Sequence, residues 1–293
     1  VVYIPVLPMV LVNGCSGIAT GWSSNVPAHK PDDVRRLCLD ILSGTPPTKL
    51  VPHYKGFLGS ITPRGDDDDG VFVCRGVNTV ARNGDDWIVR VTEIPVGTSI
   101  EKYKDFLVHA ENTGKIKTFS NNSNDTDVDF TVEISGSVQP GEIERELCLT
   151  STISTNNMHL LVDGNVVKFD TVESIARHFC DRRLVYYQMR IQSILGSVAE
   201  RIAELMNKII FINSICDGTL EISGVPFEEA RSRILALNLI EPDLLLSIPI
   251  KNLTLERVQK LQSDLQAAER TQREYLDTSP TALFTRELET LEI

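Results

Sequence analysis

The most constraining feature of the sequence is a run of apolar residues in its second half that recur at alternating gaps of three and four. The run consists of Leu195, Val198, Ile202, Leu205, Ile209, Ile212 and Cys216. Such an a/d heptad seam is typical of a coiled-coil helix rather than of an ordinary amphipathic helix, because a 3.5-residue repeat keeps one narrow stripe facing a partner. At a rise of 1.5 Å per residue, a helix over residues 195–216 would be roughly 30 Å long.

A second seam of the same kind follows later and indicates a partner helix within the chain. Its apolar positions are Val258, Leu261, Leu265, Ala268 and, after the polar Gln272, Tyr275. Two such seams joined by a compact connection favour an antiparallel hairpin of long helices. We therefore predict an arm with an outgoing helix in residues 166–216 and a return helix in residues 251–293.

The connection between the seams, residues 217–250, is predicted to contain short helices at 226–237 and 241–246. It ends in an unusually apolar run from Leu244 to Ile250. We expect a small cap on a long arm to be unable to bury so many large side chains, so that a partner surface covers them. A second copy across a two-fold axis is the simplest partner. The residues assigned to this dimer interface are Leu244, Leu245, Leu246 and Ile248.

Upstream of the arm, short β-prone runs alternate with turn residues, which is typical of an α+β domain built from local hairpins. The predicted strands are residues 57–62, 71–74, 87–93 and 130–135. Helices are predicted at 31–43, where a proline and two aspartates begin the run, and at 99–110. The predicted fold class is therefore α+β followed by all-α.

The remaining segments of the first half are predicted to be irregular or edge-like. Residues 1–12 have a β-rich apolar composition, and residues 13–27 are predicted to form a glycine-rich loop. Four consecutive acids, Asp66–Asp69, lie between glycines and indicate a solvated hairpin tip rather than a metal site. The cysteines and histidines lack the spacing of metal ligands, so no metal site is assigned.

The formal net charge of −11 argues against binding nucleic acid through bulk charge, since a DNA-binding surface is basic. The distribution of charge qualifies this objection. Residues 1–31 contain no Asp or Glu, so all 40 acidic residues lie from Asp32 onward. The N-terminal segment can therefore approach phosphates.

The apolar run at residues 1–12 is interrupted by Pro5 and Pro8 and is too short to span a bilayer, so no membrane segment is predicted.

Residues 13–21, Asn-Gly-Cys-Ser-Gly-Ile-Ala-Thr-Gly, are the part of the chain most open to a mechanistic interpretation. A phosphate-binding P-loop needs Lys and then Ser or Thr after its last glycine, whereas Gly21 is followed by Trp22. A nucleophile elbow needs one residue between its serine and the second glycine, whereas Gly17 follows Ser16 directly. Neither catalytic pattern is present.

Two interpretations of this segment remain open from the residues alone. In one, the glycines remove side chains so that the backbone can press against DNA, and Ile18 is an exposed apolar wedge that unstacks a base step. In the other, the segment is an ordinary tight turn and Ile18 is buried.

The run from Val10 to Trp22, followed by Asn25-Val26-Pro27, resembles the segment of type IIA DNA topoisomerases that lies just C-terminal to their catalytic winged-helix domain. In that family the isoleucine after the second glycine inserts between base pairs and helps to bend the gate DNA. The resemblance assigns this role to Ile18. The other residues that it places against DNA are Asn13, Gly14, Ser16, Gly17, Thr20 and Trp22.

Weaker similarity continues in order along the chain. Residues 53–61 resemble the start of the family's tower domain, and residues 152–158 resemble the segment that returns from it. Residues 179–190 are similar to the helix that opens the family's coiled-coil arm. Tyr3–Pro8 and Thr20–Ser23 resemble the eukaryotic and large-DNA-virus branch. Candidate contacts to the DNA backbone near the base of the arm are Arg182, Arg183 and Arg190.

The resemblance implies a domain organisation of five segments. These are the end of the DNA-gate domain with the intercalating loop (1–30), a hairpin-rich tower (31–165), the outgoing coiled-coil helix (166–216), the exit-gate dimerisation region (217–250) and the return coiled-coil helix (251–293).

Several parts of the family's enzyme have no counterpart here, namely the catalytic tyrosine, the acidic metal-binding domain and the ATPase. The sequence also lacks an initiator methionine. We therefore expect a fragment of an isomerase that is inactive alone and holds no cofactor. The resemblance implies that the complete enzyme uses Mg²⁺ and ATP bound elsewhere. Its implied partners are double-stranded DNA, a second copy, and the upstream ATPase, metal-binding and winged-helix parts.

Two other functions are compatible with parts of the sequence. A non-catalytic coiled-coil dimerisation scaffold would explain the heptads and the net acidity without DNA. A self-contained hydrolase would use the glycine-rich segment, but neither a base nor an oxyanion motif accompanies it. The expected location is nuclear for a cellular protein, or a viral factory or virion for a large DNA virus, and secretion is not expected.

Overall fold

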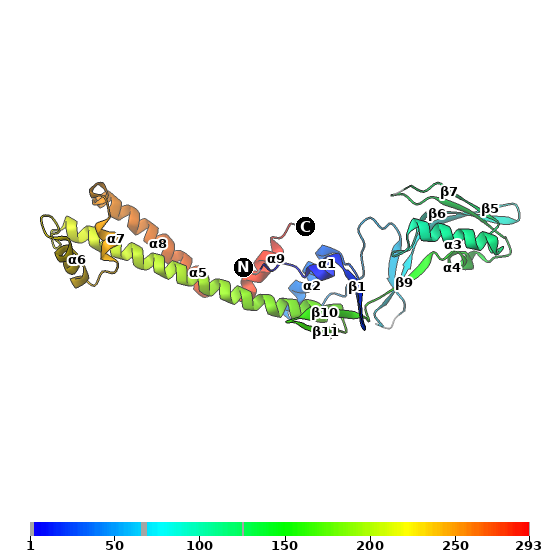
Figure 1. Ribbon diagram of the computed structural model, residues 1–293, viewed down its shortest axis with the longest axis horizontal. Helices are drawn as coiled ribbons and strands as arrows, with labels where there is room; N and C mark the ends of the chain where they lie inside the picture. Colours follow the sequence, from blue (N-terminus) through cyan, green and yellow to red (C-terminus); the bar gives the residue numbers. More distant parts are fainter. Residues whose placement is uncertain (1–2, 66–68, 125, 293) are drawn as a thin grey trace. The chain divides into compact units, whose positions relative to one another are not determined.

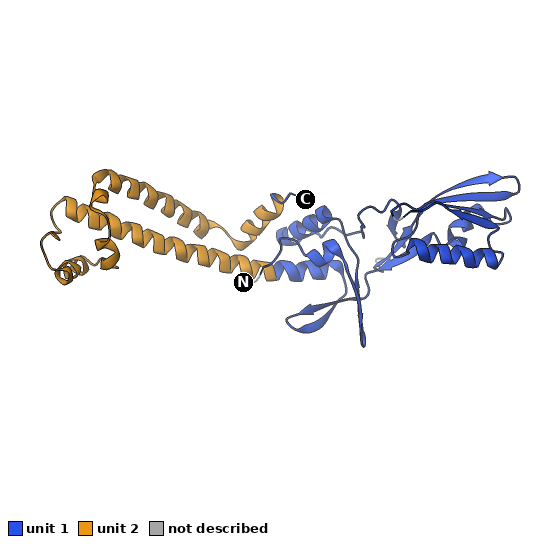
Figure 2. Cartoon of the chain, turned by 45° about the horizontal axis from the view of Figure 1, so that its top comes forward, with its two compact units in different colours: residues 1–181, 290–293 blue, residues 182–289 orange. Residues whose placement is uncertain are grey.

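The structure is a computed structural model that describes residues 3–65, 69–124 and 126–292. The chain divides into two compact units, coloured separately in Figure 2: residues 1–181 with 290–293, and residues 182–289. Each unit has its own hydrophobic core. The finer division into five segments stays a prediction.

The N-terminal segment contains a short helix where β structure is predicted. Helix α1 (Met9–Asn13) follows Pro8, whose carbonyl oxygen accepts a hydrogen bond of 2.8 Å from the Leu11 amide. Leu11 is fully buried, and this packing overrides the β propensity of the run. Gly14 ends the helix with a φ of 71°, which a side chain would make unfavourable. The prediction of β-rich structure is therefore wrong over α1.

The predicted glycine-rich loop at 13–27 is instead mostly an antiparallel hairpin. Strand β1 (Cys15–Ala19) pairs with β2 (Trp22–Val26) through a two-residue turn. Gly21 occupies the second turn position with a φ of 78°, so its lack of a side chain makes the tight turn possible. The glycines that indicate a loop thus permit a hairpin.

Helix α2 (Pro31–Ser43) confirms the predicted helix and its signals. Proline stands at the start, and Asp32 and Asp33 occupy the first turn, where they complement the helix dipole. Gly44 closes the C-terminus in the left-handed conformation. The helix buries Val34, Leu37 and Cys38.

The core of the first unit lies between a four-stranded antiparallel sheet and α3 (Ile100–Asn112), which runs alongside the sheet in Figure 1. In spatial order the strands are β5 (Val77–Asn83), β6 (Asp86–Glu93), β8 (Phe130–Ile134) and β7 (Thr118–Asn121). Sheet residues such as Val89 and Phe130 pack against Tyr103 and Leu107 of the helix. The predicted strands at β6 and β8 and the predicted helix are confirmed. Strands β5 and β7 are not predicted from the sequence, because they are mostly exposed and contain few apolar residues.

The strands of a three-stranded sheet lie on both sides of the four-stranded sheet in sequence, and their spatial order is β3 (Ser60–Pro63), β4 (Val71–Arg75) and β9 (Thr150–Ser154). The first two strands form a hairpin that agrees with the sequence, whereas β9 was not predicted. The acidic run joins β3 to β4, but residues 66–68 of it lie outside the described residues. A turn of 3₁₀ helix (Pro140–Glu142) and α4 (Ile143–Glu146) precede β9.

A second hairpin, unpredicted from the sequence, consists of β10 (Met158–Val162) and β11 (Asn165–Phe169). Its two turn residues, Asp163 and Gly164, both have positive φ values of 48° and 84°. Two positive values define the type I′ turn that suits the twist of paired strands. The segment predicted as the outgoing arm helix therefore begins with the strand β11.

The long helix α5 (Val172–Cys216) starts in the first unit and continues through the second. In the second unit, the chain returns along it as α8 (Leu255–Asp277) and α9 (Pro280–Glu289), two helices rather than one (Figure 2).

The contacts at its two ends show that the return path is antiparallel to α5. The Cys216 sulfur lies 4.0 Å from the Leu253 carbonyl oxygen, whereas the rings of Tyr187 and Phe284 are 5.1 Å apart. The predicted seam positions of α5 are buried or half-buried apart from Cys216, which is exposed.

The cap of the second unit contains the two predicted short helices, α6 (Phe227–Ala236) and α7 (Pro242–Leu246), and a 3₁₀ turn (Ile250–Asn252). The expectation that this cap leaves its apolar side chains to a partner is wrong for Leu245, which is only 3% exposed.

The reason is that the ends of the arm helices join the core of the cap. Phe211 and Val258 pack in one cluster with Leu245. Leu246 and Ile248 are half-buried against the same cluster, whereas Leu244 is 58% exposed. Of the four residues assigned to a dimer interface, only Leu244 therefore presents most of its side chain to solvent.

We expect Leu245→Ala to lower the free energy of unfolding by about 2–5 kcal/mol, because it leaves a cavity in the cap. Leu235→Ala is the matched control, since it removes the same atoms from an exposed side chain of α6 in the same cap and should change that free energy by about 0.5 kcal/mol or less. Urea unfolding followed by circular dichroism measures both. Equal losses for the two variants would contradict the burial of Leu245.

Candidate nucleic-acid interface

The β1–β2 hairpin presents Ile18 to solvent. All five residues of β1 are exposed, and the Ile18 side chain is 92% exposed. An isoleucine this exposed gains nothing from the hydrophobic effect in the isolated chain. The alternative in which Ile18 is buried in a tight turn is therefore excluded.

The register of the hairpin separates its side chains into two faces, because directly paired residues share a face and successive residues alternate. Ile18 pairs with Ser23, so these two side chains lie on one face. Ala19 pairs with Trp22 and lies on the other face. Ile18 and Trp22 therefore point to opposite sides, although the resemblance assigns both to DNA contact.

The base of the hairpin is held by main-chain packing and by a buried histidine. The Leu11 carbonyl oxygen accepts a 2.8 Å hydrogen bond from the His29 amide and lies 3.2 Å from its ring Nδ1. Burial lowers the pKa of His29, which favours the neutral ring. A side chain at Gly14 would come within 2.9 Å of the Ala28 nitrogen, so the glycine permits a close approach of backbone to backbone.

The outer edge of β2 is contacted by the start of β10. The Asn25 amide donates to the Asn157 carbonyl oxygen at 2.7 Å, and the Asn157 side-chain amide donates to the Ser23 hydroxyl at 2.8 Å. The Ser24 hydroxyl donates to the His159 carbonyl oxygen at 2.7 Å and accepts from the His159 amide at 3.1 Å.

The ring of His159 adds a contact to the same edge. It meets the Trp22 ring edge-on, with centroids 5.5 Å apart and an interplanar angle of 70°. Sequence reasoning missed these contacts. The partners are separated by as many as 135 residues, and nothing local in either segment indicates the other.

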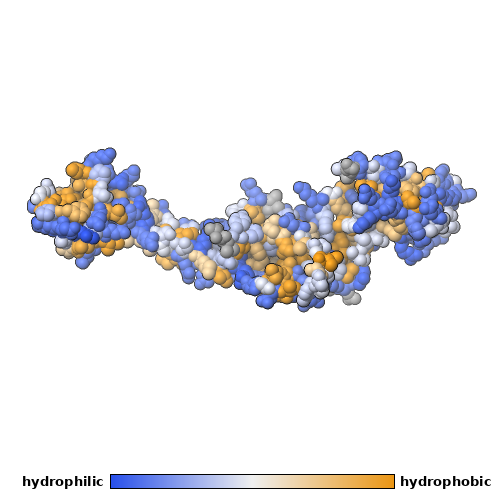
Figure 3. All heavy atoms as spheres, viewed as in Figure 1, coloured by the Kyte–Doolittle hydropathy of each residue, from blue (hydrophilic) through white to orange (hydrophobic). Residues whose placement is uncertain are grey.

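Hydrophobic side chains gather over β1 and over the β10–β11 hairpin in the middle of the view of Figure 3. The exposed ones in these two hairpins are Ile18, Trp22, Leu161, Val166 and Val167. Because residues 1–31 carry no acidic side chain, the β1–β2 hairpin has no charge of its own to repel a phosphate.

The three arginines assigned to the DNA backbone have different environments. Arg182 is exposed. Arg183 is only 8% exposed, and its guanidinium lies 4.9 Å from the Tyr187 ring centroid and 3.4 Å from a Glu287 oxygen. Arg190 lies 2.7 Å from the other oxygen of Glu287. The assignment of Arg183 to DNA is therefore corrected: its charge is neutralised inside the second unit.

Glu287 of α9 is the centre of this cluster. Burial opposes its ionised form, but hydrogen bonds from Tyr187 and Arg190 and the charges of Arg190 and Arg183 outweigh burial and lower its pKa. Burial, together with the hydrogen bond to Glu287, raises the pKa of Tyr187 to about 12. The cluster fastens α9 to α5 within the second unit.

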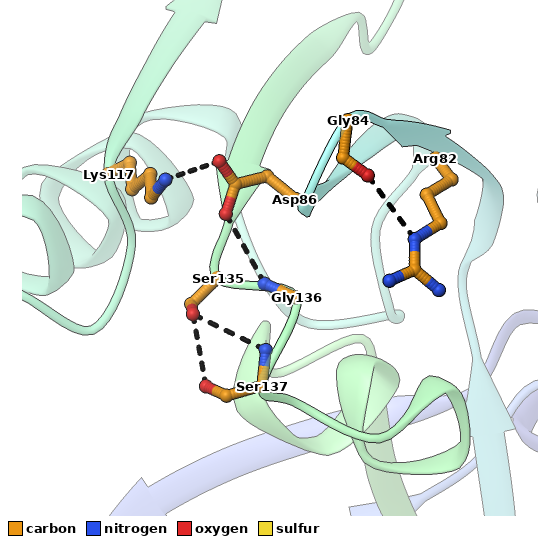
Figure 4. A network of polar contacts seen from close by, with 7 residues as sticks. All are labelled: Arg82, Gly84, Asp86, Lys117, Ser135, Gly136 and Ser137. Atoms are coloured by element: carbon orange, nitrogen blue, oxygen red, sulfur yellow. Dashed lines mark hydrogen bonds and ion pairs between the residues drawn. The ribbon is translucent and has the colours of Figure 1, made fainter.

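Two cations in or beside the four-stranded sheet, Arg90 and Lys117, are also paired with carboxylates. Figure 4 shows Asp86 between the Lys117 ammonium group and the Gly136 amide, from which it accepts hydrogen bonds. The bond from Lys117 lowers the pKa of Asp86. Arg90 donates to Asp129 at 2.8 Å. Such pairing competes with binding of phosphate by the same cations.

Residues 3–65, 69–124 and 126–292 contain no group of three or more His, Cys, Asp or Glu side chains that could hold a metal ion. None of the helices in the described part of the chain has the length and hydropathy of a membrane span.

Comparisons with known proteins agree with the geometry. A family model for the A-type subunit of DNA gyrase/topoisomerase IV matches residues 1–289. DNA topoisomerase 2 of Pisum sativum is 35% identical over 234 residues, which are 76% of this chain and 16% of that protein. DNA topoisomerase 2 of Penicillium chrysogenum is 30% identical over 307 residues, covering 90% of this chain and 19% of that protein.

A solved structure has the same fold. The crystal structure of the Plasmodium falciparum topoisomerase II DNA-binding, cleavage and re-ligation domain matches with a TM-score of 0.75 and 26% identity, covering 98% of this chain and 44% of that one.

An α+β unit with an exposed hairpin, followed by a long helix, is thus the fold of a type IIA topoisomerase cleavage domain. The chain belongs to the DNA gyrase/topoisomerase IV family, in the part represented by its A-type subunit. Both curated relatives named above are eukaryotic DNA topoisomerases 2, in agreement with the branch that the sequence indicates. The chain spans less than a fifth of the length of either.

We expect Glu287→Gln to destabilise the second unit by about 1–3 kcal/mol at neutral pH, because it leaves the buried Arg183 guanidinium without its carboxylate. The lowered pKa of Glu287 means that this stabilisation exists above its ordinary value of 4.5 and is lost as the pH falls through the folded value. The difference between the two proteins should therefore disappear in acid.

Thermal unfolding at a series of pH values measures this difference. Glu289→Gln on the same helix is the matched control, since Glu289 is exposed and lies outside the cluster. A loss for Glu287→Gln that stays constant from neutral to acid pH would contradict the electrostatic explanation.

Proposed function

We propose that this chain binds and bends the gate DNA duplex of a type II DNA topoisomerase, with Ile18 as the side chain that inserts between base pairs. The observation that carries the proposal is the nearly complete exposure of Ile18 on a hairpin whose base is firmly packed. An apolar side chain that enters a base step offsets the cost of unstacking by allowing a bent duplex to contact more protein surface.

The other assigned residues take different roles in this proposal. Ser16 lies on the face of Ile18 and contacts the DNA backbone. Gly17 and Thr20 flank the inserting residue, where a side chain at Gly17 would meet nothing and its absence lets the duplex approach. Asn13 is exposed at the base of the hairpin and binds phosphate.

Two residues assigned to DNA contact act instead through the hairpin itself. Gly14 permits the close approach at the base, and Trp22 supports the hairpin from the face opposite Ile18. Arg182 and Arg190 of α5 remain candidate backbone contacts in the proposal, since Arg182 is exposed and the Arg190 side chain is 53% exposed.

In the complete enzyme, DNA bending by this chain would serve the ATP-dependent passage of one duplex through another. The catalytic tyrosine, the Mg²⁺ site and the ATPase would be supplied by the upstream winged-helix, metal-binding and ATPase parts. An enzyme that acts on chromosomal DNA in a eukaryote would be located in the nucleus.

The second unit would form the protein exit gate of a homodimer. Its antiparallel helices and cap fit an arm that carries a dimer contact at its end. Leu244 would be the centre of that contact, with Leu246 and Ile248 contributing from beside the core.

The alternative function is a non-catalytic dimerisation scaffold. The heptad seams and the net charge of −11 favour it, since neither requires DNA. The two functions differ in what they require of Ile18: a scaffold has no use for an exposed apolar side chain on a hairpin outside its second unit.

We expect Ile18→Ala to reduce bending of a duplex by the chain, because alanine is too short to unstack a base step. Fluorescence resonance energy transfer between dyes at the two duplex ends measures the bend at low salt, where phosphate contacts are strongest. Leu58→Ala is the control, since Leu58 is an exposed leucine of the same unit outside the hairpin. Equal bending by wild type and Ile18→Ala would favour the scaffold.

We expect Leu244→Glu to weaken self-association of the chain by at least tenfold, because a charge would be buried at the dimer contact. Light scattering over a concentration series measures the dissociation constant. Leu276→Glu is the matched control, since Leu276 is an exposed leucine near the C-terminal end of α8, the end further from the cap in sequence. An unchanged dissociation constant for Leu244→Glu would remove the assignment of the exit gate to this surface.

A further inference from the structure

We infer that Asn157 and His159 are positioning residues for Ile18: they hold the β1–β2 hairpin in the orientation that presents Ile18 to DNA. This inference rests on the function proposed above. Asn157 directly precedes β10 and His159 lies in it, so both follow the four-stranded sheet in sequence, whereas the β1–β2 hairpin precedes that sheet.

The hairpin needs an external support because its own interactions are few. An isolated two-stranded hairpin is marginally stable in water. All five residues of β1 are exposed, and Val26 is the only residue of the two strands that is buried. An apolar residue that must push between stacked bases needs a rigid base, since a mobile hairpin would yield instead of the DNA.

Asn157 reaches the face of the hairpin that carries Ile18. Its carbonyl oxygen accepts from the outer-edge amide of Asn25, and its side-chain amide donates to the hydroxyl of Ser23. Ser23 is the direct cross-strand partner of Ile18. The Asn157 side chain therefore holds Ser23, which lies next to Ile18 on the same face.

His159 supports the opposite face. Its main chain forms two hydrogen bonds with the Ser24 hydroxyl, and its ring meets Trp22 edge-on. Trp22 pairs with Ala19, the neighbour of Ile18 along β1. The outer edge of the hairpin is thus contacted on both faces. Asn157 contacts the face that carries Ile18, and His159, two residues further on, contacts the opposite face.

The support is itself anchored within the first unit by burial and by hydrogen bonds. Met158, between the two positioning residues, is fully buried. Just before them, Thr155 donates to the Gly70 carbonyl oxygen through its amide at 2.9 Å and its hydroxyl at 3.1 Å. Side chains that alternate between this buried anchor and the hairpin can transmit the rigidity of the anchor to Ile18.

A double-mutant cycle tests whether His159 acts through Ile18. Binding to a prebent duplex and the bend of a straight duplex are compared for wild type, Ile18→Ala, His159→Ala and the double variant. We expect His159→Ala to weaken binding to the bent duplex about fivefold. In the Ile18→Ala background the same change should have almost no effect. Asn157→Ala should behave in the same way.

The fold of the variants is checked with fluorine NMR of fluorotryptophan protein, because the chain has two tryptophans, Trp22 and Trp87. His159→Ala should shift and narrow the Trp22 signal and leave the Trp87 signal unchanged. Leu58→Ala is the control, since Leu58 is an exposed leucine of the same unit that lies outside both hairpins. It should alter neither signal nor the bend.

The outcomes separate the inference from the function on which it rests. Normal bending by Ile18→Ala overturns the proposed function. If Ile18→Ala is defective but His159→Ala and Asn157→Ala bend DNA as wild type does, the positioning role is wrong. The positioning role is also wrong if His159→Ala and Asn157→Ala weaken binding as much in the Ile18→Ala background as in the wild type, because such additive losses would show direct contacts to DNA.

Discussion

The structure of the candidate interface depends on the contact between β2 and the segment that begins β10. A hairpin with no buried side chains on one strand has no core of its own, so its orientation is set by what holds its edge and its base. Hydrogen bonds from Asn25 and Ser24 to a segment 132 to 135 residues further along the chain supply the edge, and the Leu11–His29 contact supplies the base. The chain between these contacts, which contains the four-stranded sheet, therefore leaves and returns at the edge of the hairpin that carries Ile18.

Several cationic side chains of this protein are paired with carboxylates within the same unit. Arg183 and Arg190 share Glu287, Lys117 is bonded to Asp86, and Arg90 is bonded to Asp129. This pairing leaves the net charge of −11 unchanged and makes fewer of the cations available to phosphate. Because residues 1–31 carry no acidic side chain, the β1–β2 hairpin itself adds no negative charge that would repel a phosphate.

The candidate site could be predicted in part. The glycine spacing and its resemblance pointed to Ile18, and the structure adds that the side chain is exposed and that Trp22 lies on the other face. The same glycines led to the wrong local structure, since Gly21 permits a tight turn between paired strands. Arg183 shows the opposite failure: arginine is usually exposed, and only the approach of α9 buries it against Tyr187 and Phe284.

Elements whose signals are local and periodic could be recognised from the amino-acid sequence without any other information. Helix α2 carries its own start and stop residues, and α5 and α8 carry seams of regular spacing, so none of them depends on distant residues to be recognised. Folding in three dimensions was needed to place Leu245 in the core of the cap, Glu287 against two arginines, and Asn157 and His159 beside the hairpin. The physical reason is that burial and hydrogen-bond partners are properties of the folded surroundings, and residues far apart in a chain leave no trace of their contact in either local pattern.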